Sequence, residues 1–344
     1  MIYMAEVIVD ALRGGLVESR HYGDIAVADG TGKLIAKVGE EERRTFTRSS
    51  IKSWQALALY SLWPEARDTF TLEERGVMLA SHSGEPRHVA AVKSILDKMG
   101  ISPDYLKCGV HPPIHEGTRD ELIRRGEAPN QLHCNCSGKH AGMLTLSKHM
   151  GWDLEGYLEH THPVQVEILK IIQRLTDIPA PDVDVRIDNC SVPTFFLPLK
   201  NLATGMARLT TPEKYFADDG NFLAACRLLT GTFYPAAYYI GGTDRFCTDF
   251  NGAGEGRFIG KVGGEGVYLG ALPGKDRGIA LKVDDGDRGG RAYGQAIVEI
   301  LHQLGALTED DKKKLAKYHN TPIYNFRNIL IGMVTCVFKL EWSS

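Results

Sequence analysis

The chain has 344 residues, 43% hydrophobic and 24% charged, a composition typical of a globular protein with a large core. Its formal net charge of -3, with no basic block and no acidic tail, argues against a nucleic-acid partner or a membrane-surface role. The seven cysteines are irregularly spaced and odd in number, so we expect reduced thiols in a cytoplasmic protein. Residues 1–6 lack the features of a signal peptide, so no export is expected.

The first forty residues predict strands. Residues 24–28 and 33–38 are β-prone and flank the turn sequence Asp29-Gly30-Thr31-Gly32, which indicates a hairpin. The run 7–9 is also β-prone. Helical patterns follow, with apolar residues at helical spacing in four segments: 50–63, 86–99, 138–149 and 163–175.

After residue 241 the pattern returns to strands. Residues 257–262, 266–272 and 278–283 are predicted strands, and a last clear helix is expected over 292–304. The apolar run 329–338 is too short to span a bilayer and predicts a buried strand.

Strands at both ends and helices between them predict an α/β (α+β) fold. We expect one mostly antiparallel sheet built from both termini, with an inserted helical lobe. A single catalytic domain would cover residues 1–344. Its sheet lobe would take about 1–45 and 240–344, and its helical lobe about 46–239.

The segment Ser49-Ser50-Ile51-Lys52 places a hydroxyl and an amine three residues apart at the start of a predicted helix. This spacing puts both groups on one face of the helix. A lysine that has lost its proton can activate a serine, and the positive end of a helix favours the neutral amine. A serine in this position can also be only a helix N-cap.

Three later segments carry similar groups: the polar loop 81–86, the helix start 134–140, and Lys261-Val262-Gly263 at the end of a β-prone run. Each has a structural alternative. The loop can be a simple turn, Lys261 a solvated lysine, and His140 a core histidine. Cys136 and Cys190 can be small buried hydrophobic residues.

Taken together, these segments have an order that is known from other enzymes. Ser-x-x-Lys, a Ser-x-Ser loop and a Lys-Val-Gly strand follow the motif order of serine β-lactamases and penicillin-binding proteins. Those proteins use a serine nucleophile, a lysine base, a second serine and a second lysine. Two of the three motifs differ here, so the order favours a β-lactamase-like fold rather than a β-lactamase.

Over nearly its whole length the chain resembles the Rhizobium etli-type L-asparaginases, also called the asparaginase II family. The resemblance is carried by six ordered segments: 48–52, 81–86, 135–143, 162–165, 187–190 and 261–266. It implies hydrolysis of L-asparagine to L-aspartate and ammonia by a homodimer. The implied fold is similar to that of the serine β-lactamases and glutaminases.

The resemblance implies two Ser-Lys dyads, Ser49 with Lys52 and Ser81 with Lys261. In the mechanism that we expect, Ser49 attacks the side-chain amide of asparagine while Lys52 takes its proton. Ser81 and Lys261 then carry protons to the leaving ammonia and from the attacking water. Which serine is acylated stays open at this point.

The resemblance also implies a zinc site at Cys136, Lys139 and Cys190, which would support substrate binding rather than supply the nucleophile. Lysine must be neutral to bind zinc, and nearby thiolates and the helix start are expected to favour that state. The implied substrate contacts are Arg48, His140 and Asp188. We expect Asp188 to pair with the substrate ammonium and Arg48 with its carboxylate.

Several positions depart from the family pattern. Ser53-Trp54 replaces Pro-Phe, Asn189 and Ser191 replace glycines, and Cys134 is an additional thiol. Asparagine and glutamine differ by one methylene, worth about 1–3 kcal/mol of discrimination, so their ranking stays open. A glutaminase or another β-lactamase-like serine amidohydrolase is the enzymatic alternative. A thiolate zinc-binding module without catalysis is the third.

Overall fold

The computed structural model describes residues 5–343, so residues 1–4, which bear on the signal-peptide prediction, lie outside the described part. The chain divides into two units by its internal contacts. The first takes the residues up to 50, 197–211 and those from 257 onward; the second takes 51–196 and 212–256. The expectation of a single catalytic domain stays a prediction.

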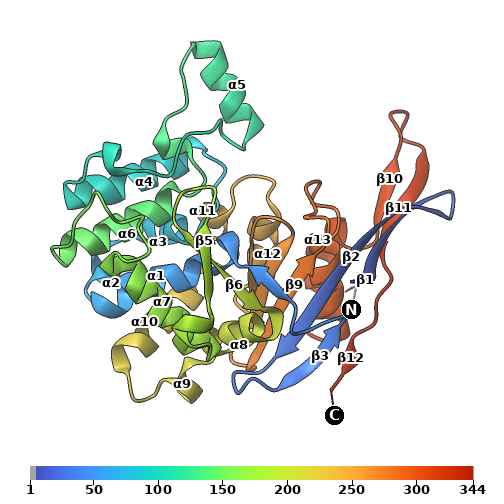
Figure 1. Ribbon diagram of the computed structural model, residues 1–344. Helices are drawn as coiled ribbons and strands as arrows, with labels where there is room; N and C mark the ends of the chain where they lie inside the picture. The colour runs from blue at the N-terminus through green and yellow to red at the C-terminus, as the bar shows by residue number, and fades with distance from the viewer. Residues whose placement is uncertain (1–4, 344) are drawn as a thin grey trace. The chain divides into compact units, whose positions relative to one another are not determined.

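The first unit is built on an antiparallel sheet whose nine strands come from both ends of the chain. The strands are β1 (Glu6–Arg13), β2 (Leu16–Ala28), β3 (Leu34–Val38), β7 (Ile259–Val262), β8 (Val267–Leu272), β9 (Arg277–Val283), β10 (Thr321–Tyr324), β11 (Leu330–Cys336) and β12 (Glu341–Trp342). Their order is β10-β11-β1-β2-β9-β8-β7, with β3 paired to both β2 and β12 (Figure 1). This arrangement, with helices inserted between the two groups of strands, confirms the predicted fold class.

The register of the sheet joins distant parts of the sequence. Val9 of β1 lies opposite Cys336 of β11, and Ile25 of β2 lies opposite Leu281 of β9. The predicted hairpin is confirmed, because β2 pairs with β3 across the turn, with Ala28 opposite Leu34.

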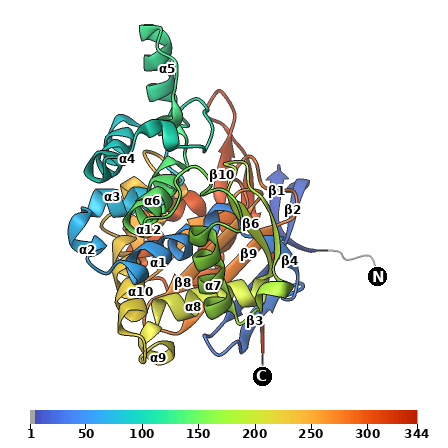
Figure 2. The same ribbon diagram turned by 60° about the vertical axis from the view of Figure 1, so that its left-hand side comes forward.

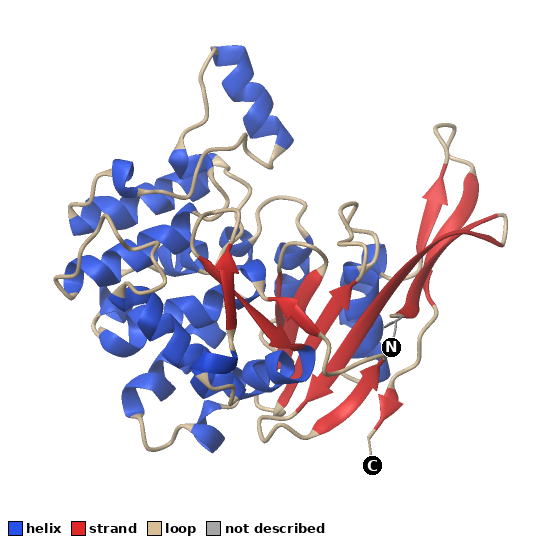
Figure 3. Cartoon of the chain, viewed as in Figure 1, coloured by secondary structure: helices blue, strands red, loops and turns tan. Residues whose placement is uncertain are grey.

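The expectation of a buried strand at 329–338 is wrong in one respect. The strand exists as β11, but Val334 is its one buried residue. The β1–β2 and β10–β11 hairpins project beyond the rest of the sheet (Figure 3), so the apolar residues near their tips lack a covering layer.

Two helices cover the middle of the sheet. Both α8 (Leu199–Thr210) and α13 (Tyr293–Gln303) pack against β8 and β9. All six residues of β8 are buried, as expected for a strand in the middle of a core. The remaining elements of this unit are β4 (Arg44–Phe46), α14 (Glu309–Lys314) and η5 (Ala316–Tyr318), with most of the turn η1 (Arg48–Ile51).

The second unit is helical and is organised around α1 (Lys52–Leu62). Helices α6 (Ser137–His149), α7 (Pro163–Thr176) and α10 (Gly220–Thr232) pack against it (Figure 2). Residues 52–60 of α1 are all buried, which explains why its polar residues are enclosed as well as its apolar ones. The helices predicted at 50–63, 138–149 and 163–175 are therefore confirmed within about two residues.

Further elements complete the second unit. They are α2 (Ala66–Thr69), α3 (Leu72–Met78), α4 (Pro86–Met99), η2 (Pro103–Tyr105), α5 (Glu116–Arg125), η3 (Gln131–His133), η4 (Ala180–Asp182), α9 (Pro212–Tyr215), α11 (Ala237–Ile240), α12 (Phe246–Gly254) and the hairpin of β5 (Asp184–Ile187) with β6 (Pro193–Pro198), whose last residues belong to the first unit. Helix α4 begins at Pro86 and ends at a left-handed Gly100, as its sequence predicts. No helix within residues 5–343 is long and apolar enough to cross a membrane.

Candidate active site

The segment that carries Ser49 forms the short 3-10 turn η1 before α1. Neither serine caps the helix, because the N-cap position is Ile51 and no side chain caps it. The Ser50 hydroxyl instead donates to the carbonyl of Thr47 at 2.6 Å. Ser49 is half-buried beside it, so the cap interpretation of these serines is wrong.

The segment 261–266 lies beside η1 in the first unit. A Cβ on Gly264 would lie 3.2 Å from the guanidinium carbon of Arg48, and one on Gly263 would lie 3.3 Å from Ser50 Cβ. Lys261, on β7, is only 1% exposed, and its Nζ donates to the Val262 carbonyl at 2.6 Å. The interpretation of Lys261 as a solvated lysine is therefore wrong.

Lys52 is the first residue of α1 and has no exposed surface. Its Nζ lies 3.1 Å from the hydroxyl of Ser81 and 3.2 Å from the thiol of Cys136. It also donates to the carbonyls of Ala80 and Asn135. The structure thus joins the lysine of the first predicted dyad to the serine of the second.

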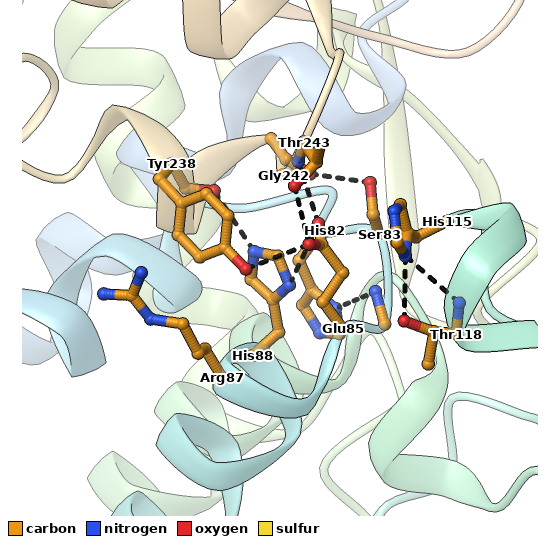
Figure 4. A network of polar contacts seen from close by, with 12 residues as sticks. His82, Ser83, Glu85, Arg87, His88, His115, Thr118, Tyr238, Gly242 and Thr243 are labelled. Carbon is orange, nitrogen blue, oxygen red and sulfur yellow. Dashed lines mark hydrogen bonds and ion pairs between the residues drawn. The ribbon is translucent and has the colours of Figure 1, made fainter. Parts of the chain in front are cut away.

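The loop 81–86 is held by polar contacts of its own unit (Figure 4). The carboxylate of Glu85 accepts hydrogen bonds from the Thr243 backbone and hydroxyl, at 2.8 and 2.7 Å, and from the Tyr238 hydroxyl at 3.0 Å. Burial alone would raise the pKa of Glu85, but these hydrogen bonds outweigh it and lower the pKa. Ser83 donates to the Gly241 carbonyl at 3.0 Å. The loop is therefore held in one conformation by its own unit, which a purely structural turn would show as well.

His82 ties this loop to the start of α6. Its Nδ1 accepts from the Gly84 backbone N–H at 3.2 Å, so its Nε2 donates to the Ser137 hydroxyl at 2.9 Å. Burial, aided by His88, holds the pKa of His82 well below its usual range. The His82 ring stacks on His88, with centroids 5.2 Å apart (Figure 4). The role of His82 was missed from the sequence, although it lies within the motif 81–86.

The thiol groups of the predicted zinc site gather at the first turn of α6. Cys136 hydrogen-bonds to the thiols of Cys134 and Cys190, and these bonds lower its pKa well below the usual value despite burial. Lys139 Nζ lies 2.9 Å from Cys190 Sγ. A Cβ on Gly138 would lie 2.2 Å from the carbonyl of Val77, so a glycine is needed where this turn meets α3.

Lys139 differs from the expectation of a neutral amine. Burial would lower its pKa, but Cys190, Cys136 and Asp188 outweigh burial and raise it. Zinc binding would therefore have to displace a proton from Lys139, as it does from thiols. Two thiols and an amine in contact still form a donor set suited to zinc. Within residues 5–343, no group of three or more His, Cys, Asp and Glu side chains is arranged to hold a metal ion.

The turn that presents Asp188 and Cys190 explains one departure from the family pattern. The Asp188 carboxylate accepts from the Asn189 N–H at 2.8 Å and lies 3.7 Å from Cys190 Sγ. Ser191 has a φ of 75°, a left-handed conformation that glycine adopts without strain. The turn requires a left-handed residue at this position, which explains the glycine expected there. Ser191 adopts the same conformation at some cost in energy. None of the seven cysteines, all within residues 5–343, forms a disulfide bond.

His140 contacts a tyrosine that no sequence motif marks. Its Nδ1 lies 2.7 Å from the hydroxyl of Tyr157, and both side chains are fully buried. Burial and the neighbouring Lys139 hold the pKa of His140 well below its usual range. Its Nε2 has no hydrogen-bond partner among the described residues. One ring nitrogen of His140 is therefore hydrogen-bonded, and the other has no partner among the described residues.

The predicted site residues fall in both units. Six of those in the second unit lie in connected contacts: Lys52, Ser81, Cys136, Lys139, Asp188 and Cys190. Arg48, Ser49 and Lys261 belong to the first unit. Each predicted dyad has one member in each unit, so the pairing of Ser49 with Lys52 and of Ser81 with Lys261 stays a prediction.

Residues 9–336 match the sequence profile of a family of amidohydrolase enzymes. That family is L-asparaginase II, and the chain belongs to it. The predicted resemblance to the asparaginase II family is thereby confirmed. Among the curated proteins, none matches the chain.

Several solved structures are weakly similar. One is a β-lactamase from Mycobacterium bovis, at 13% identity and a TM-score of 0.43, with 83% of this chain and 95% of that chain covered. Another is Mglu in its native form in 4.3 M NaCl, at 17% identity and a TM-score of 0.38, with 83% of this chain covered. Mglu in its L-glutamate binding form has 18% identity and a TM-score of 0.37, over 88% of this chain and 63% of that chain. The chain spans only 61% of the first Mglu structure.

Proposed function

We propose that this chain hydrolyses L-asparagine to L-aspartate and ammonia, as a Rhizobium etli-type L-asparaginase, through an acyl-enzyme on a serine. The proposal is carried by the buried Lys52 amine, 3.1 Å from the Ser81 hydroxyl. Among the described residues Lys52 contacts two carbonyls, the Ser81 hydroxyl and the sulfur of Cys136, whose pKa is lowered. An amine in such surroundings can exchange a proton with a serine during acyl transfer.

In this mechanism Ser49 attacks the side-chain carbonyl of asparagine and Lys52 takes the serine proton. Ammonia leaves with a proton delivered through Ser81 and Lys261, and a β-aspartyl ester remains on Ser49. Water then hydrolyses the ester. Backbone N–H groups near Ser49 would stabilise the oxyanion, each by about 10²–10³-fold in rate.

The substrate itself would be held by charge. Asp188 would pair with the ammonium group of asparagine, Arg48 with its carboxylate, and His140 would contact it as well. Cys136, Lys139 and Cys190 would hold a zinc ion, whose positive charge would help to organise the substrate. A serine supplies the nucleophile of the first step, and Ser81 with Lys261 would take the proton of the attacking water in the second, so this mechanism gives the metal no part in activating water.

The decisive test is the Ser49→Ala variant. It should lose ammonia release from asparagine by a factor on the order of 10⁴ or more, while its circular dichroism stays that of the folded wild type. Wild-type turnover in this variant would contradict the role of Ser49. Ser81→Ala is the matching variant of the second candidate serine. Mass spectrometry of the acid-quenched wild type identifies which of the two serines carries the acyl group.

The remaining parts of the proposal have separate tests. Ammonia release from L-asparagine and L-glutamine, together with turnover of a chromogenic β-lactam and a D-Ala-D-Ala peptide, separates an asparaginase from other serine amidohydrolases. Measuring the same rates with and without added zinc, and in Cys190→Ser, tests the metal site. We further propose a cytoplasmic homodimer with no nucleic-acid or membrane partner; light scattering and cell fractionation test this.

A further inference from the structure

His140, in the first turn of α6, has a buried ring nitrogen that no described residue contacts. The side chain has no exposed surface, and its Nε2 finds no partner among residues 5–343. A buried polar group without a partner typically costs about 1–3 kcal/mol. Such groups are rare in native structures and call for a specific explanation, such as a ligand that completes them.

The contacts of the other ring nitrogen, Nδ1, show whether Nε2 is a hydrogen-bond donor or an acceptor. The Tyr157 hydroxyl lies 2.7 Å from His140 Nδ1 and accepts the Lys107 backbone N–H at 2.9 Å. The Lys107 amide can only donate, and Nδ1 is the one group among residues 5–343 placed to accept the tyrosine proton, so the buried hydroxyl is satisfied when it donates to Nδ1. Nδ1 is therefore an acceptor, and the single proton of the neutral ring lies on Nε2.

Tyr157 is itself held in place. It is fully buried, and its backbone carbonyl accepts from the Gln165 side chain at 2.8 Å. Its ring meets the His140 ring edge-on, with centroids 5.5 Å apart and an angle of 89° between the planes. The tyrosine therefore fixes both the orientation and the tautomer of His140.

A buried N–H donor pairs most strongly with an acceptor that carries negative charge. A carboxylate oxygen of an amino acid has that chemistry.

We infer that Tyr157 is a positioning residue, which holds His140 so that its Nε2–H donates to a carboxylate oxygen of the amino-acid substrate. The inference deepens the proposed function and rests on it. Tyr157 does not touch the reacting atoms, so its removal should weaken substrate binding more than the chemical step.

The Tyr157→Phe variant removes only the hydroxyl. We expect KM for asparagine to rise about tenfold, with kcat changed less than about threefold, because a hydrogen bond to a charged group is weakened. Tyr60→Phe is the matched control, since Tyr60 is also buried and its hydroxyl contacts Met78 at 3.4 Å. Wild-type KM in a folded Tyr157→Phe protein would overturn the inference.

A second variant separates positioning from general packing. In His140→Gln the side-chain amide supplies an N–H donor that needs no tautomer lock. Adding Tyr157→Phe to His140→Gln should then raise KM by less than about twofold, whereas independent effects would multiply. A full tenfold rise in the double variant would show that Tyr157 acts through packing and would overturn the inference.

Ring ¹⁵N spectra of His140 test the inference without turnover. The wild type should show a protonated Nε2 and an unprotonated Nδ1, and added L-aspartate should shift the Nε2 signal. Tyr157→Phe should lose the single tautomer. If asparagine is not hydrolysed, the proposed function fails but the spectra still decide the tautomer. A proton on Nδ1 in the wild type, or no shift with L-aspartate, would overturn the inference.

Discussion

The loop 81–86 and the first turn of α6 are both polar and both buried, but they treat their polar groups differently. In the loop, Glu85 takes three hydrogen bonds and Ser83 is bonded to a carbonyl of the same unit. In the turn, Lys139 and Cys136 contact other thiols, and the Nε2 of His140 has no partner in the part of the chain that the structure describes. The carboxylate of the loop is thus satisfied by its own unit, whereas the turn holds a buried ring nitrogen that its own unit does not satisfy.

Lys52 is the group that joins the two regions, so its replacement should have the largest effect. Lys52→Met keeps a long apolar chain but removes the amine that contacts Ser81 and Cys136. We expect asparagine-dependent ammonia release to fall by about 10²–10⁴-fold, the usual contribution of a general base. Activity within tenfold of wild type in a folded protein would separate Lys52 from the chemistry.

A second change tests whether the turn of α6 depends on close packing. In Gly138→Ala the new Cβ would lie 2.2 Å from the carbonyl of Val77, so we expect a loss of about 1–3 kcal/mol in the free energy of unfolding. Gly142→Ala is the control, because its Cβ would meet Met78 at an ordinary 3.5 Å. The control should gain up to about 1 kcal/mol from helix propensity. Equal urea midpoints for the two variants would contradict this account.

The smallest effect on activity is expected from the loop, through Glu85→Gln. Because the pKa of Glu85 is lowered in the folded state, its carboxylate stabilises the fold above the unfolded pKa, near the model-compound value of 4.5. That stability is lost as pH falls through the lower folded pKa. At pH 7 the free energy of unfolding of the wild type should exceed that of Glu85→Gln by about 1–3 kcal/mol. This difference should narrow below pH 4.5.

Urea unfolding at several pH values measures this gap, and ammonia release at pH 7 should stay within about threefold of wild type. A constant gap between pH 7 and pH 3 would show that the charge of Glu85 contributes nothing. A large loss of activity would show that the loop is more than a scaffold.

Sequence patterns predicted those elements that local signals determine. Pro86 and Gly100 mark the ends of α4, and the turn at 29–32 marks the hairpin of β2 and β3. The pairing of β1 with β11 has no local signal, because it depends on how the whole sheet assembles. Exposure along β11 was misjudged for the same reason, since an apolar run does not reveal whether anything covers it.

The candidate site follows the same division. Lys52, Cys136 and Lys139 lie in motifs and were predicted, and the structure places them in contact with other predicted residues. Tyr157 was missed because it lies outside the predicted helices and owes its role to a contact with His140. From the sequence alone, Ser191 was only a departure from the family's glycine. Its left-handed backbone in the structure gives the physical reason why a glycine is usual there.

The pairing of Val9 with Cys336 also has a consequence for how the chain is made. A ribosome adds about 5–20 residues per second, so β1 leaves the exit tunnel roughly tens of seconds before β11 exists. During that interval one edge of β1 exposes unpaired N–H and C=O groups, which readily pair with strands of other chains. Slow translation or chaperone binding at the N-terminus should therefore affect the folding of the sheet unit more than the folding of the helical unit.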